Sequence, residues 1–184
     1  EIMSSDWSSD VCSSDLYICG IDEAGRGPLA GPVTAAAVLP GPETPVELLK
    51  DSKVLSVGQR DRAAARIRGT AYAWSIGWAD HREIDALNIH YAALLAMERA
   101  FHFIILALRS RGLERIPISR VLVDGKFLPP LGEHWQAEAI IGGDRSVPAI
   151  SAASILAKTA RDAWMVREEE RYPLYAFAKH KGYP

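Results

Sequence analysis

The sequence predicts an α/β domain in which a mixed five-stranded sheet is flanked by helices. Five short apolar runs have the length of strands, and three of them come before any long helix. Two long segments, 85–108 and 151–171, carry apolar side chains at helical spacing. With 184 residues and a hydrophobic fraction of 48%, the chain fits one ordinary globular domain.

The first three strand candidates follow one another closely. The run at 17–22 ends in acidic residues, the run at 33–39 is closed by prolines, and the run at 71–79 is aromatic and rich in strand formers. A helix is expected at 56–67. Strands this close in sequence can form an antiparallel meander.

The second half of the chain alternates helices and strands. After the helix at 85–108, a short buried strand is expected at 121–123 and a fifth strand at 137–141. The last long helix, 151–171, ends before a proline, whose ring disfavours helical geometry in the residue before it. The later strands need crossover connections, so the sheet is expected to be mixed.

Composition narrows the class of protein. Residues 1–16 repeat Ser-Ser-Asp and hold four acidic residues and no basic one, so we expect a disordered or non-native tail. The remaining 19 acidic and 21 basic residues (23 acids less those four) give a net charge of +2, which permits phosphate binding. No apolar run approaches the roughly 20 residues of a membrane span. Two cysteines make no disulfide framework or zinc pattern, which favours the cytoplasm.

Acidic side chains stand where two predicted strands end. Asp22 and Glu23 close the first strand, Asp124 closes the fourth, and Asp162 on the last helix could add a fourth carboxylate. If the two strands are neighbours, their carboxylates converge and favour a bound cation such as Mg²⁺ or Mn²⁺. Two such ions would suit phosphoryl displacement. The alternative is an Asp that caps a turn or a helix, which is weaker for two adjacent acids.

Five sequence blocks follow one another along the chain. They are GIDEAGRGPLAGPV from Gly20, DSK from Asp51, VDG from Val123, ISAASILAK from Ile150 running on to Arg161-Asp162, and AKHKGY from Ala178. In these blocks and in their order the chain resembles bacterial ribonuclease HII, from 17 to 184. The resemblance implies a ribonuclease H-like fold in a catalytic domain at 17–184 that lacks the family's C-terminal segment. It also implies a metal-dependent endoribonuclease.

The resemblance assigns the chemistry to four acids. They would be both the catalytic residues and the ligands of two Mn²⁺ or Mg²⁺ ions, and they are Asp22, Glu23, Asp124 and Asp162. The implied substrates are RNA–DNA hybrids and ribonucleotides embedded in duplex DNA, cut to leave 5′-phosphate and 3′-hydroxyl ends. We expect a monomer with no membrane association.

Substrate contacts are expected from three places. The turn Gly25-Arg26-Gly27 would read the ribonucleotide, because glycines let the backbone approach closely and main-chain groups can hydrogen-bond a 2′-hydroxyl; the alternative is a plain glycine-rich turn. The resemblance points to Tyr183 as a residue that packs against the sugar. Lys53 is a candidate phosphate contact, although an exposed lysine is usually only solvated. The pattern of a nucleotide P-loop is absent.

The last helix has an apolar and a polar side. Lys158, Arg161 and Asp162 are expected on or beside the polar side, where Lys158 either pairs with Asp162 or contacts a phosphate. His180 lies between two lysines, whose charges disfavour its protonation, so we expect a structural or phosphate-facing role. Lys126 stands where the family usually has Asn.

Two other functions stay open on the sequence alone. A related metal nuclease acting on DNA would need the acids but not the turn that reads a 2′-hydroxyl. A catalytically inactive hybrid-binding fragment would bind the same substrate without cutting it.

Overall fold

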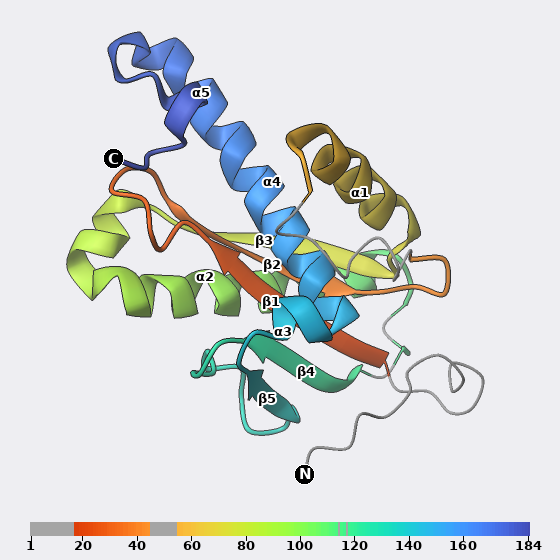
Figure 1. Cartoon of the computed structure of the whole chain (residues 1–184). Helices are drawn as coiled ribbons and strands as arrows, with labels where there is room; N and C mark the ends of the chain where they lie inside the picture. The colour runs from red at the N-terminus through yellow and green to blue at the C-terminus, as the bar shows by residue number, and fades with distance from the viewer. Residues whose placement is uncertain (1–16, 45–54, 114, 117) are drawn as a thin grey trace.

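The computed structural model describes residues 17–44, 55–113, 115–116 and 118–184, so the tail at 1–16 and Lys53 lie outside it (Figure 1). Its elements, in order, are β1 (Tyr17–Ala24), β2 (Val33–Leu39), α1 (Val57–Thr70), β3 (Ala73–Ala79), α2 (His81–Ser110), β4 (Ile118–Asp124), β5 (Ala137–Ile140), α3 (Gly143–Ser146), α4 (Pro148–Arg171), the 3₁₀ helix η2 (Pro173–Tyr175) and α5 (Phe177–His180). All five expected strands and three expected helices are present, with ends within four residues of the prediction. The short elements α3, η2 and α5 were not expected.

The sheet is mixed, as expected, with the strand order β3-β2-β1-β4-β5. The first three strands form the antiparallel meander, while β4 and β5 are parallel to β1. In the register of β1 and β4, Ile21 lies beside Val123. The residues that follow, Asp22 and Asp124, therefore reach the same end of the sheet.

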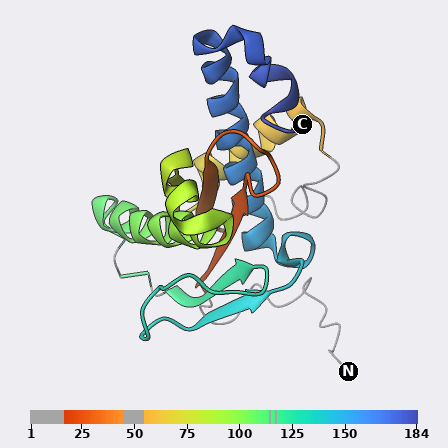
Figure 2. The same cartoon turned by 90° about the vertical axis from the view of Figure 1, so that its left-hand side faces the viewer.

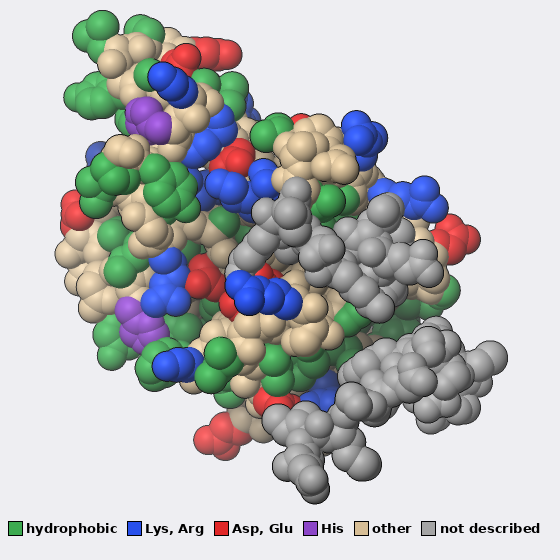
Figure 3. Space-filling view, viewed as in Figure 1, with side chains coloured by type: hydrophobic (Ala, Val, Ile, Leu, Met, Phe, Trp, Pro, Cys, Tyr) green, Lys and Arg blue, Asp and Glu red, His purple; other side chains and the backbone are tan. Residues whose placement is uncertain are grey.

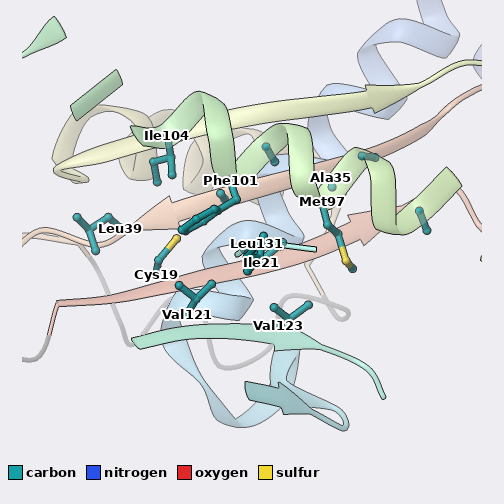
Figure 4. Close-up of a cluster of buried hydrophobic side chains, with 14 of the residues drawn as sticks. Cys19, Ile21, Ala35, Leu39, Met97, Phe101, Ile104, Val121, Val123 and Leu131 are labelled. Atoms are coloured by element: carbon teal, nitrogen blue, oxygen red, sulfur yellow. The ribbon is translucent and has the colours of Figure 1, made fainter. Parts of the chain in front are cut away.

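Helices cover both faces of the sheet, α2 on one side and α1 with α4 on the other (Figure 2). Strand β2 shows how the sequence serves both layers. Its Ala35 and Ala37 pack in the cluster under α2, whereas Ala36 and Val38 pack in the cluster under α1 and α4. Figure 4 shows the first of these clusters, where Phe101 of α2 reaches toward β1 and β4.

Helix α2 supplies much of the apolar surface of the core. An 18-residue window in it has a mean hydropathy of 1.6, which by length and composition alone would suffice to cross a membrane, and 44% of that window is buried in the molecule. The core helix of a water-soluble protein passes the same test, so the finding is weak support for a membrane span. Helix α2 is also interrupted at Asn88, whose φ of 68° is left-handed.

Helix starts and close approaches have local causes. Ser56 caps α1 in a capping box with Gln59, and Asp80 caps α2 in the same way with Glu83.

At Gly20 of β1 a side chain is impossible, because a Cβ there would lie 2.1 Å from the backbone of Ala149. The start of α4 can therefore rest directly on the sheet.

Candidate active site

Three of the four expected acids meet at the carboxyl ends of β1 and β4. Asp22 is only 5% exposed and senses the charges of both Glu23 and Asp124. Its carboxylate accepts a hydrogen bond from the Ser154 hydroxyl of α4 and one from the Glu23 N–H, the latter at 2.7 Å. The parallel pairing of the two strands is what brings these acids together.

The electrostatics of Asp22 are those of an acid without sufficient counter-charge. Burial, followed by the neighbouring charges of Glu23 and Asp124, raises the pKa of Asp22 well above its usual range, and its hydrogen bonds offset this only in part. A bound cation would favour the ionised carboxylates and so counter both effects. Ionised Asp22 therefore destabilises the metal-free fold, and a positively charged ligand can offset this destabilisation.

The other two acids of this group have different partners. Glu23 pairs through Oε1 with the Arg26 guanidinium at 3.2 Å, while its buried Oε2 has no hydrogen-bond partner among the described residues. Asp124 is half-buried, and its Oδ1 accepts a hydrogen bond from the Asp144 N–H at 3.3 Å. Within the part of the chain that the structure describes, Glu23 therefore keeps one buried oxygen available to a ligand.

Asp162 is held by basic side chains instead. Its carboxylate lies 2.8 Å from Lys158 Nζ, one turn earlier on α4, and 3.7 Å from Arg60 Nη1 on α1. Within the described residues, no three Asp, Glu, His or Cys side chains are arranged to hold a metal ion as they stand. The structure therefore brings three of the acids together and leaves the fourth in a pair with Lys158 and Arg60.

A groove of about 390 Å³ opens beside these acids. Its walls combine acidic Glu23 with basic and polar groups, and the residues that matter here are Gly25, Arg26, Gly27, Arg60, Ser154, Lys158 and Tyr183. Acidic side chains in the middle of this face are surrounded by basic ones (Figure 3). Such a mixture can hold a cation at its centre and phosphates around it.

The expected recognition turn and Tyr183 face each other across the groove. A Cβ on Gly27 would lie 3.4 Å from Tyr183 Cε1, and Lys158 Nζ lies 5.9 Å from the centre of the Tyr183 ring. The tyrosine is 48% exposed, so one side of its ring is open to a ligand. Two segments more than 150 residues apart thus form opposite walls of one groove.

His180 has a structural role, one of the two expected for it. Its Nδ1 accepts a hydrogen bond from the Gly182 N–H at 3.0 Å, and its Nε2 lies 2.6 Å from the Tyr175 carbonyl oxygen. Both ring nitrogens are therefore occupied in shaping the turn that precedes Tyr183. Lys126, by contrast, is exposed.

The expectation for Arg161 is wrong. This residue was expected on or beside the polar side of α4, but it is 1% exposed and is among the largest fully buried side chains described. The spacing along the helix could not show this, because the groups that surround the guanidinium are backbone carbonyls of distant loops. Arg60 was also missed, since nothing near it in sequence indicates that it faces Asp162.

Solved ribonucleases H share this fold. The chain superimposes on the PCNA:RNase HII complex from Archaeoglobus fulgidus with a TM-score of 0.67 at 28% identity, covering 85% of this chain and 78% of that one. Bst-RNase HIII in complex with Mn²⁺ gives a TM-score of 0.71 at 18% identity, covering 86% and 56%, and shows the fold alone. The fold and its acidic sheet end define a protein of the ribonuclease H-like class, as expected.

Sequence comparison gives the family. A profile described as Ribonuclease HII matches residues 19–184. Ribonuclease HII of Laribacter hongkongensis is 52% identical over 170 residues, which cover 92% of this chain and 81% of that one. Ribonuclease HII of Nitrosospira multiformis is 48% identical over 176 residues, covering 94% and 81%. The chain belongs to the ribonuclease HII family, and the expected enzyme class, ribonuclease H, is confirmed.

Proposed function

We propose that the chain is an endoribonuclease that hydrolyses the RNA strand of RNA–DNA hybrids and cuts at ribonucleotides embedded in duplex DNA. Cleavage would leave 5′-phosphate and 3′-hydroxyl ends. The observation that carries the proposal is the groove itself. It joins Glu23, beside buried Asp22, to a glycine turn and to an open tyrosine ring.

The acids have the donor chemistry of a Mg²⁺ or Mn²⁺ site. Carboxylate oxygens are the ligands these ions prefer. Two observations on the described residues fit such a site: the pKa of Asp22 is raised, and the buried Oε2 of Glu23 has no hydrogen-bond partner among them. Asp22, Glu23 and Asp124 would hold the ions, and Asp162 would join them on leaving Lys158. Two bound ions would supply an activated water and neutralise charge at the scissile phosphate. Mn²⁺ accompanies Bst-RNase HIII, a protein of the same fold.

The remaining groups of the groove would bind and orient the substrate. Main-chain groups of the turn at Gly25 and Gly27 would hydrogen-bond the 2′-hydroxyl, and the Tyr183 ring would pack against the neighbouring sugar. Lys158 and Arg60 would contact phosphates once Asp162 is released, because each then has a free positive charge. A DNA strand offers the turn no hydroxyl, so discrimination would rest on this contact.

The direct test is digestion of three matched duplexes, with and without Mn²⁺ or Mg²⁺. One is an RNA–DNA hybrid, one is DNA with a single ribonucleotide, and one is all DNA. We expect cutting of the first two, on the 5′ side of a ribonucleotide, only when the metal is present. Cutting of the all-DNA duplex would favour the DNA nuclease instead. Binding of the hybrid without metal-dependent cutting would favour the inactive binding fragment.

Changing Gly27 to Ala should impair substrate binding without unfolding the protein. The new Cβ would make an ordinary contact with Tyr183 at 3.4 Å, so the fold can accept it, but it would fill the gap meant for the sugar. We expect KM on the single-ribonucleotide duplex to rise at least about tenfold, a loss of binding near 1.4 kcal/mol, measured by steady-state cleavage.

Gly69→Ala is the matched control, because a Cβ at Gly69 meets nothing within 4 Å and lies on α1 away from the groove lining. It should leave KM unchanged. If Gly27→Ala cleaves with the KM of the parent, the sugar does not pass between the turn and Tyr183.

The monomeric state and the cytoplasmic location stay predictions.

A further inference from the structure

Within the part of the chain that the structure describes, the buried guanidinium of Arg161 donates hydrogen bonds to backbone carbonyls alone. Its Nε donates to the Pro32 carbonyl at 2.9 Å, its Nη2 to the Ala30 carbonyl at 2.8 Å, and its Nη1 to the Lys181 carbonyl at 2.9 Å. Among the described residues it forms no ion pair. Burial of this cation is costly, because desolvation lowers the pKa of Arg161 although the nearby charge of Asp162 opposes the shift. The arrangement therefore calls for a reason other than stability.

The three carbonyls belong to the two walls of the groove. Ala30 and Pro32 follow the recognition turn, and Lys181 precedes Gly182 and Tyr183. The two walls also bond to each other, because the N–H groups of Leu29 and Ala30 both donate to the Gly182 carbonyl, at 2.9 Å and 3.3 Å. Arg161 lies directly behind this junction.

Glycines let the walls close onto the guanidinium. Gly25 has a φ of +109°, and a Cβ there would lie 2.4 Å from Arg161 Nε. Gly31 has a φ of +95°, and a Cβ there would lie 3.1 Å from Arg161 Nη2. The loop from Gly25 to Gly31 thus packs closely against the planar guanidinium, at distances that leave no room for a Cβ at Gly25. The guanidinium is a rigid fork that donates from three separate nitrogens held in one plane, whereas the three N–H groups of a lysine ammonium diverge from a single nitrogen and cannot hold three carbonyls at the same separations.

We propose that Arg161 is a positioning residue that sets the separation between the turn at Gly25–Gly27 and the ring of Tyr183. The proposal rests on the proposed function, since it concerns how that site fits a ribonucleotide. Arg161 does not touch the substrate in this arrangement. It acts through the two loops that would.

Lysine at this position keeps the charge and loses the fork, so Arg161→Lys is the informative variant. We expect faster amide hydrogen exchange at Leu29, Ala30 and Tyr183, with protection of β1 and α2 unchanged. Cleavage of the single-ribonucleotide duplex should fall at least about tenfold more than cleavage of a long hybrid, because one sugar must then fit a groove of the wrong width. Arg161→Met should behave the same way, which separates the fork from the charge.

Arg167→Lys is the matched control, since Arg167 is exposed on the same helix. It should change neither the exchange nor the ratio of the two cleavage rates. Hydrogen exchange reads the loops without any substrate, so it tests the positioning role even if the parent fails to cut hybrids and the proposed function fails. Uniform loosening of the whole fold in Arg161→Lys, or parent-like exchange with an unchanged cleavage ratio, would overturn the proposal.

Discussion

Replacing Asp124 with Asn should abolish cleavage and leave the fold intact. The amide has nearly the same shape, and its oxygen can still accept the hydrogen bond from the Asp144 N–H. It lacks the negative charge with which Asp124 would hold a divalent cation beside Asp22. We expect the single-turnover rate on an RNA–DNA hybrid to fall at least about 10³-fold, with an unchanged circular dichroism spectrum.

Glu138→Gln provides the matched acid-to-amide control on the neighbouring strand β5. Its carboxylate pairs with Arg120 on the surface, and exposed pairs of this kind contribute about 0–1 kcal/mol. This variant should cut at the rate of the parent. A parent-like rate for Asp124→Asn would show that the three-acid group at the sheet end is not the metal site.

Replacing Asp22 with Asn should stabilise the metal-free protein at neutral pH while removing activity. The folded state raises the pKa of Asp22, so on going to higher pH the unfolded chain loses its proton first. Because the folded state then binds more protons, the free energy of unfolding falls as pH rises from about 4, the usual pKa of Asp, through the raised pKa. Asn cannot ionise, and it should add about 1–2 kcal/mol at pH 7.

Thermal unfolding in a chelator, at pH 3.5 and at pH 7, measures this effect. The melting temperature of Asp22→Asn should exceed that of the parent at pH 7, and the difference should shrink at pH 3.5, where the carboxyl is mostly protonated in both states. Added Mn²⁺ should raise the melting temperature of the parent more than that of the variant, because a ligand stabilises the state that binds it. Equal melting temperatures at pH 7 would mean that the carboxylate of Asp22 does not destabilise the metal-free fold.

The sequence predicts the layers of this fold well because its signals are local. Alternating or continuous apolar runs mark the strands, and the capping box at Ser56 marks where α1 begins. The neighbouring positions of β1 and β4 could be expected only from the acids at both ends, because no pattern within a strand names its partner. The break at Asn88 was missed for a similar reason. The apolar spacing of α2 continues across it, and only the backbone shows the left-handed residue.

The site was predictable where chemistry lies within a motif and unpredictable where tertiary contacts decide. The glycine turn and the Asp22-Glu23 pair are contiguous, so they could be named. Arg161 stands in a motif too, but its burial depends on carbonyls contributed by loops far along the chain. The pairing of Asp162 with Arg60 likewise follows from how α1 packs beside α4, which helical periodicity does not report.

The contact at Gly20 links the orientation of α4 to the position of Asp162, because both Ala149 and Asp162 lie on this helix. The helix is seated on β1 at Ala149, whereas Asp162 lies 13 residues further on, about 20 Å away at the rise of an α-helix. A tilt of only about 5° at that seat would sweep the far carboxylate through roughly 2 Å. The absence of a methyl group at Gly20 thus sets how closely the start of α4 approaches β1, and through the helix it affects how near Asp162 comes to the acids at the sheet end.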